Sequence, residues 1–219
     1  MKHLTRQNGT HDLLEKYCNN TQHARQVQKL SLLLFDATYG ILHDYSGKKR
    51  KLLEAGSLLH DIGRYIADEG HNKHSYELIM QEGIDGFEKE DVEIIANIAR
   101  YHRGSMPQKS HKNYALLPDK RTRRKVKRLA SFVRIADGLD RDKQALIENI
   151  SCSFDNNANI LAITLTPLSE EYTPDYKIFQ NKKGLLEKAF KTKKLNRSLE
   201  TQISEEIFIK LREEVSDEQ

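Results

Sequence analysis

The stretch SLLHDIGRYIADEG, residues 57–70, decides the fold, because it places His60 and Asp61 side by side at the end of an apolar run. Both side chains can bind a metal ion, yet they stand where the buried end of a helix is expected. Burial of such groups costs free energy unless a hydrogen bond or a cation satisfies them. The pair is therefore either hydrogen-bonded within the core or the centre of a metal site.

Helical periodicity surrounds this stretch over most of the first 145 residues. Apolar side chains recur at the spacing of one helix face, and Gly63, Gly83 and Gly104 are expected to end helices. Asn20 or Thr21 is the expected N-cap of the second helix. The pattern predicts helices over residues 10–18, 20–42, 48–63, 71–83, 89–104 and 126–141.

The periodicity changes near residue 146. Two β-rich runs on either side of DNNAN, residues 155–159, predict a hairpin. An amphipathic helix is expected over 182–195, a further strand over 195–200 and a closing helix over 203–215. The expected fold class is mainly α, with a helical bundle over residues 1–145 followed by a small α+β appendix over residues 146–219.

Composition indicates a globular cytoplasmic protein. Hydrophobic residues make up 37% of the 219 residues and charged residues 31%. Cys18 and Cys152 are far apart, as is typical of a reducing compartment, and no apolar run approaches the roughly 20 residues that cross a membrane. The net charge of +4 is concentrated in KRTRRKVKR, residues 120–128. This segment is either a solvated face or a contact for an anionic partner, and its lack of interleaved aromatic residues argues against nucleic acid.

Ionisable side chains recur on apolar helix faces beyond the opening pair. His23, His102 and Asp137 each occupy such a face, and His74 follows a loop. Each residue alone is more typical of a hydrogen-bonded core side chain or a cap. Together, on separate helices, they favour a shared divalent cation. Mixed imidazole and carboxylate ligands suit Zn, Fe or Mn better than Ca.

The order His, then His-Asp, then Asp resembles the HD superfamily of metal-dependent phosphohydrolases. The stretches LLHDIGRYIADEGHNKHSYELI, IANIARYHRGSMP and VKRLASFVRIADGLDR resemble the HD domain in the C-terminal half of the exopolyphosphatase and guanosine pentaphosphate phosphatase family. The resemblance implies that one metal ion is held by His23, His60, Asp61 and Asp137. It also implies a second ion at His74 and His102, with His71 competing with His74 for that role.

Three departures from the resembled pattern bear on function. Arg64 stands where HDIGK members carry Lys, and an arginine favours phosphate binding over acid catalysis. In the resembled family an actin-like domain performs the polyphosphate chemistry, and we expect no such domain within these 219 residues. The stretch YHRGSMP also lacks the Gly-Tyr-Pro element of the cyclic-dinucleotide branch.

The expected function is metal-dependent hydrolysis of a phosphate ester or anhydride in a nucleotide or polyphosphate-like substrate. Asp61 is the expected catalytic residue, and Arg64, Arg103 and Arg141 the expected phosphate ligands. The cofactor is one or two divalent ions of Mn, Fe, Zn or Mg. A non-catalytic HD module that binds such a ligand and regulates a partner is the alternative. The appendix is a candidate homodimer interface or a lid.

Overall fold

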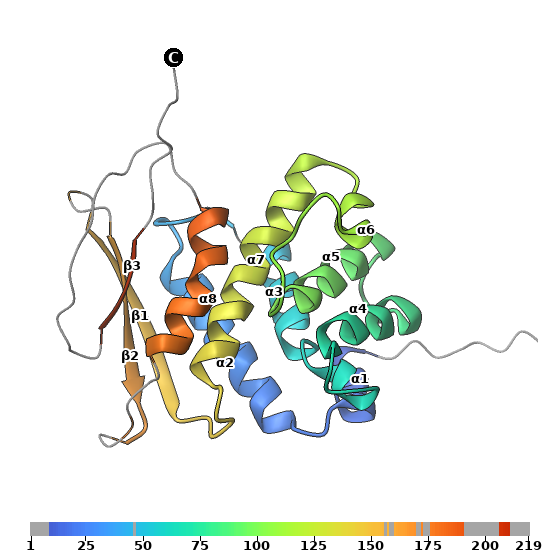
Figure 1. Ribbon diagram of the computed structural model, residues 1–219, viewed down its shortest axis with the longest axis horizontal. Coiled ribbons are helices and arrows are strands. Elements are labelled where there is room, and N and C mark those ends of the chain that lie inside the picture. Colours follow the sequence, from blue (N-terminus) through green and yellow to red (C-terminus); the bar gives the residue numbers. More distant parts are fainter. Residues whose placement is uncertain are drawn as a thin grey trace, which may run out of the picture.

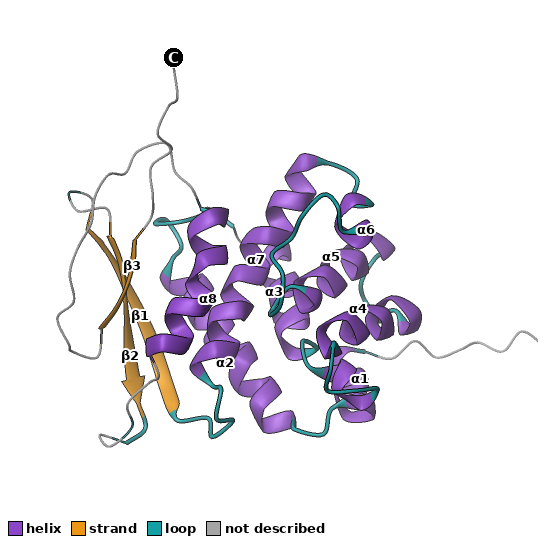
Figure 2. Ribbon diagram, in the orientation of Figure 1, coloured by secondary structure: helices purple, strands orange, loops and turns teal. Residues whose placement is uncertain are grey.

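The computed structural model describes residues 9–45, 47–155, 157, 160–169, 172, 176–190 and 206–210. A helical bundle forms one side of the molecule and a small antiparallel sheet the other, so the predicted fold class is confirmed (Figures 1 and 2). The bundle elements are α1 (Thr10–Tyr17), α2 (Thr21–Ala37), α3 (Lys48–Leu58), the 3-10 helix η1 (Ile62–Tyr65), α4 (His71–Glu82), α5 (Lys89–Arg100), α6 (Lys112–Ala115) and α7 (Lys120–Leu139).

The appendix consists of β1 (Ile147–Asp155), β2 (Ile160–Pro167), α8 (Tyr176–Ala189) and β3 (Glu206–Lys210). The strands pair antiparallel in the order β1-β2-β3, with Cys152 opposite Ile163 in the predicted hairpin. The prediction of a closing helix over 203–215 is wrong for residues 206–210, which form β3. The free edge of β2 offers backbone hydrogen bonds there, and the sequence EIFIK has high β-propensity. The strand expected over 195–200 lies outside the described residues.

α3 and α5 both end earlier than expected, and candidate site residues follow both ends. α3 stops at Leu58, so His60 and Asp61 lie in the turn before η1. α5 stops at Arg100, so His102 lies in the turn that follows and not on the helix. In such turns neighbouring side chains can converge on one point, whereas successive side chains of a straight helix point in different directions.

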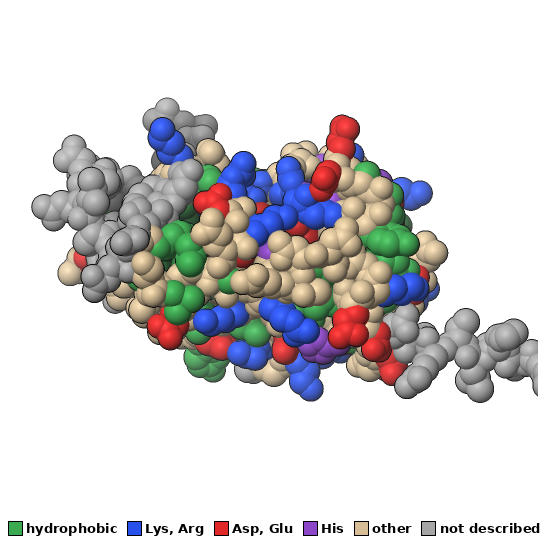
Figure 3. All heavy atoms as spheres, turned by 90° about the horizontal axis from the view of Figure 1, so that it is seen from below, with side chains coloured by type: hydrophobic (Ala, Val, Ile, Leu, Met, Phe, Trp, Pro, Cys, Tyr) green, Lys and Arg blue, Asp and Glu red, His purple; other side chains and the backbone are tan. Residues whose placement is uncertain are grey.

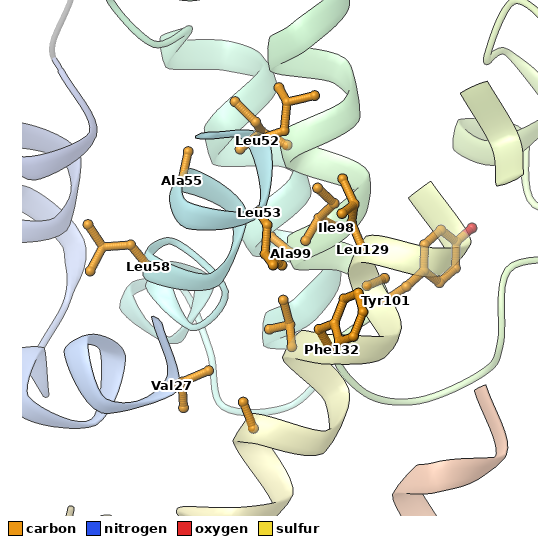
Figure 4. Close-up of a cluster of buried hydrophobic side chains, with 14 of the residues drawn as sticks. Val27, Leu52, Leu53, Ala55, Leu58, Ile98, Ala99, Tyr101, Leu129 and Phe132 are labelled. Carbon is orange, nitrogen blue, oxygen red and sulfur yellow. The ribbon is translucent and has the colours of Figure 1, made fainter. Parts of the chain in front are cut away.

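The bundle core forms where α2, α3, α5 and α7 meet. Figure 4 shows Val27, Leu53, Ile98 and Phe132 from these four helices among the buried side chains. α3 and α5 come close at Gly56, where a Cβ atom would lie 2.6 Å from Ile98 Cγ2. This close packing fixes the ends of the helices that carry the site.

The appendix packs against the bundle mainly through two pairs of elements. α8 lies along α7, and β1 contacts α2. Leu186 and Phe190 belong to the same hydrophobic cluster as Phe132 of α7. The expected boundary at residue 145 falls between α7 and β1, and the core is continuous across it. No helix among the described residues combines the length and apolarity that crossing a bilayer requires.

Candidate metal centre

The structure brings five predicted ligands together at the ends of separate elements. His23 lies in the first turn of α2, and His60 and Asp61 lie between α3 and η1. His102 follows α5, and Asp137 lies in the last turn of α7. Their ligand atoms fall into groups within 4.8 Å of one another. The sequence-based grouping of these five residues therefore matches their positions in space.

His71, and not His74, completes this cluster. His71 is 1% exposed and its Nε2 atom lies 3.0 Å from Asp61 Oδ1. The His74 side chain is 29% exposed and its Nδ1 atom lies 3.2 Å from Glu77 Oε2. The buried face of α4 is centred on Ser75 and Ile79, and helical geometry turns position 74 away from it. The prediction of His74 as the second-ion ligand is corrected accordingly.

Asp61 lies at the middle of the candidate metal centre, which we define as His23, His60, Asp61, His71, His102 and Asp137. Asp61 Oδ1 is 3.5 Å from His102 Nε2 and 3.7 Å from His60 Nε2, and Asp61 Oδ2 is 4.0 Å from His23 Nε2. Asp137 Oδ1 lies 3.7 Å from His23 Nε2 and 3.9 Å from His60 Nε2. Asp61 is thus shared by a group with His23 and His60 and a group with His71 and His102.

The four histidines are all oriented by their Nδ1 atoms. Backbone carbonyls accept hydrogen bonds from His60, His71 and His102 at 2.7, 2.8 and 2.7 Å, and a carbonyl can only accept. His23 Nδ1 donates to Asp140 Oδ2 at 2.7 Å. Every Nε2 atom therefore faces the centre, as in metal-bound histidines whose other nitrogen is held by a carbonyl or carboxylate.

The inward atoms fit a cation better than they fit one another. His60 Nε2 and Asp61 Oδ1 have no hydrogen-bond partner among the described residues, although both are buried. His71 Nε2 lies 3.4 Å from His102 Nε2, and in the tautomer set by their Nδ1 bonds both atoms are acceptors. Buried acceptors that face each other are costly, and the nearby donor is Arg103 Nη1, at 3.4 Å from His71 Nε2. A divalent ion with nitrogen and oxygen ligands would satisfy them.

Burial and the neighbouring carboxylates determine the pKa values of the histidines in the centre. Burial lowers the pKa of His60, and burial together with His60 lowers that of His102 to about 3. Burial also lowers the pKa of His23, but contacts with Asp137 and Asp140 outweigh it and raise the value to about 9. At neutral pH without an ion, both ring nitrogens of His23 therefore carry a proton, and an ion that binds Nε2 displaces the proton there.

Local sequence explains how these side chains are held. Asn20 caps α2, and its side chain accepts from the His23 backbone N–H at 3.0 Å, so the predicted cap is confirmed. Gly63 donates its N–H to Ser75 Oγ at 2.9 Å, and this hydroxyl donates to the His60 carbonyl at 2.7 Å. One side chain thus ties the HDIG turn to α4.

A basic recess of about 590 Å³ opens beside the centre. Its basic lining, which defines the name, is Arg64, Arg103, Arg134, Arg141, Lys143 and Lys182. On the face seen in Figure 3, Lys and Arg side chains gather around a hollow with acidic and histidine side chains near it. All three predicted phosphate ligands lie in this lining. Six cations around one recess suit a ligand with several negative charges.

The recess arginines make contacts that place them around the centre. Arg64 Nε donates to Asp61 Oδ2 at 2.6 Å, and Arg64 also pairs with Asp68. Arg103 Nη1 lies 3.4 Å from His71 Nε2. Arg134, which the sequence did not single out, donates to the Gly104 carbonyl at 2.6 Å. Its position one turn before Asp137 could have indicated a place near the centre. The sequence of α7 contains many other basic residues, so Arg134 was not distinguished from them.

The basic segment 120–128 lies apart from the centre. It forms the first half of α7 and lines a separate cavity of about 490 Å³ together with Lys109 and Lys188. Lys120, Arg121 and Arg124 are exposed, as expected for a solvated face.

Comparison with known families agrees with this architecture. The family model described as Ppx/GppA phosphatase, domain III, matches residues 5–197 of the 219. The match covers every described element of the bundle, together with β1, β2 and α8. The predicted relationship to exopolyphosphatases and guanosine pentaphosphate phosphatases is thereby confirmed, and the chain belongs to the Ppx/GppA phosphatase family, in the part of it described as domain III.

Proposed function

We propose that this protein is a metal-dependent phosphohydrolase of the HD type that cleaves a phosphate ester or anhydride in a nucleotide or polyphosphate-like substrate. The observation that carries the proposal is the set of inward Nε2 and carboxylate atoms, two of them buried without a partner among the described residues, beside the basic recess. Membership of a phosphatase family supports a phosphorylated substrate.

Three overlapping groups of ligand atoms lie in the centre, and they would allow two ions that share Asp61. His23, His60 and Asp61 would hold one, with Asp137 Oδ1 close to both histidines, and Asp61, His71 and His102 would hold the other. The mixed nitrogen and oxygen donors favour Mn, Fe or Zn over Mg. A bound divalent ion would supply a Lewis acid that brings the pKa of water toward about 7.

The chain's own residues would position the reactants. Asp61 would orient the attacking water by accepting its hydrogen bond, and the contact of 2.6 Å with Arg64 Nε holds this carboxylate in place. Arg103 and Arg141 line the recess, where their planar guanidinium groups suit paired phosphate oxygens. Arg64 would add charge on the same side. Together these groups would hold a phosphate next to the candidate centre.

The test combines metal content with turnover. Elemental analysis of the purified chain measures its metal content. Turnover is measured as the release of phosphate from nucleoside polyphosphates and from inorganic polyphosphate, with and without Mn²⁺. Asp61→Asn should lower turnover by at least about 100-fold. Loss of a residue that only supports a metal ligand already lowers activity by about 10–100-fold, and Asp61 is itself a proposed ligand. Asp68→Asn is the matched control, because Asp68 also pairs with Arg64 but its side chain is 84% exposed. A wild-type chain without metal or turnover refutes the proposal.

A second candidate is a non-catalytic module that binds the same ligand class. It is favoured by the side-chain cations that already neutralise both carboxylates: Arg64 at Asp61 Oδ2, and Lys182 Nζ at 2.6 Å from Asp137 Oδ2. Such pairs satisfy buried acids without an ion. Tight binding of a nucleotide by a metal-free chain that releases no phosphate would select this candidate.

A further inference from the structure

Lys182 reaches the candidate metal centre from the appendix. It belongs to α8, and its Nζ atom lies 2.6 Å from Asp137 Oδ2. The side chains of Lys182 and Asp137 are 17% and 18% exposed, so water screens the pair only in part. The other carboxylate oxygen, Oδ1, faces His23 and His60. Lys182 therefore holds one oxygen of Asp137 while the other points into the centre.

The packing of α8 on α7 provides a path for this side chain. A Cβ atom at Gly138 would lie 2.9 Å from Lys182 Cγ and 3.5 Å from Lys182 Cβ. A glycine at this position leaves the space in which the lysine stem crosses α7 on its way to Asp137. Gly138 and Lys182 also both line the basic recess. The ammonium group is thus at the boundary between the centre and the recess.

We propose that Lys182, through its ion pair with Asp137 Oδ2, opposes the positive charge of the metal and presents its ammonium group to a phosphate of the ligand in the recess. The inference rests on the proposed function and assigns a role to the appendix, which completes the site with a residue of its own. An ammonium group attracts phosphate oxygens and repels a divalent cation. Removing its charge should therefore move the two affinities in opposite directions.

The experiment measures these two affinities separately by calorimetry on the full chain. Inorganic pyrophosphate is titrated into protein freed of metal with a chelator, and Mn²⁺ is titrated in the absence of pyrophosphate. Lys182→Met, which keeps the length of the side chain, should weaken pyrophosphate about tenfold, the loss of one charge-assisted contact. The same change should tighten Mn²⁺ by a similar factor, about tenfold. Lys182→Arg should restore pyrophosphate binding, because it restores the charge.

Lys183→Met is the matched control on the same helix. Lys183 pairs with Glu187 at 3.4 Å and does not line the recess, so both affinities should stay at the wild-type values. Gly138→Ala provides a second variant that keeps every charge but pushes against the Lys182 stem, and it should also weaken pyrophosphate.

Three outcomes overturn the inference in distinguishable ways. Wild-type affinities for both ligands in Lys182→Met refute the role of Lys182 alone and leave the proposed function standing. A parallel fall of both affinities also refutes it, because a merely structural role predicts loss in the same direction. A wild-type chain that binds neither Mn²⁺ nor pyrophosphate refutes the proposed function together with the inference.

Discussion

Replacement of Gly63 by alanine should destabilise the fold strongly, because backbone atoms surround this glycine. A Cβ atom at position 63 would lie 2.1 Å from the His71 carbonyl oxygen and 2.3 Å from the Ser75 backbone nitrogen. Neither atom can yield unless α4 moves away from η1. Overpacking of this kind costs about 1–3 kcal/mol or more. The movement also breaks the two hydrogen bonds of Ser75 Oγ, to Gly63 N–H and to the His60 carbonyl, each worth about 1 kcal/mol.

The sum is about 3–5 kcal/mol, and at about 2–4 °C per kcal/mol for a chain of this size the Tm should fall by about 10 °C. Thermal unfolding followed by circular dichroism measures the change. Ser75→Ala should cost about 2 kcal/mol, which separates the hydrogen bonds from the clash. Gly184→Ala in α8 is the matched control, since its Cβ would meet only the mobile end of Met106 at 3.2 Å. Alanine favours a helix by about 1 kcal/mol, so this control should not melt earlier. A Gly63→Ala variant that melts with the wild type would refute this reasoning.

Three further predictions concern single side chains. His71→Ala should weaken Mn²⁺ at least about tenfold in a calorimetric titration while His74→Ala leaves it unchanged, and equal effects would contradict the placement of His71 in the centre. Burial lowers the pKa of His43, whose Nδ1 accepts from the Tyr45 N–H at 3.0 Å, so the folded chain resists protonation there. The unfolded chain takes up the proton below its ordinary pKa of 6.5, so His43 makes stability fall as the pH drops below that value. Urea unfolding should show a weaker dependence on acid pH in His43→Asn, and an unchanged dependence would argue against this role. Asp119→Ala removes the N-cap bond of α7 and should cost about 1 kcal/mol, or about 3 °C in Tm, which a thermal melt resolves.

Local signals in the sequence predicted most helices of the bundle, but not α6 or the start of α7. Asn20 before an apolar helical face predicted the start of α2, and its cap bond to His23 is present. The β-rich runs on either side of DNNAN predicted the hairpin of β1 and β2. These features depend on neighbours within a few residues, which is the range over which capping and periodicity act.

Other features of the site could not be predicted, because they arise from contacts between residues far apart in the sequence. His71 and His74 are three residues apart, and only the packing of α4 through Ser75 and Ile79 decides which one turns inward. Lys182 lies 45 positions from Asp137 in the chain and meets it because α8 packs along α7. β3 formed in place of a predicted helix for the same reason, since pairing with β2 overrides helical periodicity.

The Nδ1 bonds of the four histidines also determine how the chain would exchange its ions. Carbonyls of the same turn or a nearby carboxylate already fix each imidazole, so binding has little side-chain ordering left to do. Small zinc domains, by contrast, build their core around the ion and unfold when a chelator removes it. This bundle has a large apolar core of its own, so a chelator should strip the centre and leave a folded receptor that can be reloaded. Occupancy would then follow the free metal concentration reversibly, without a cycle of unfolding and refolding.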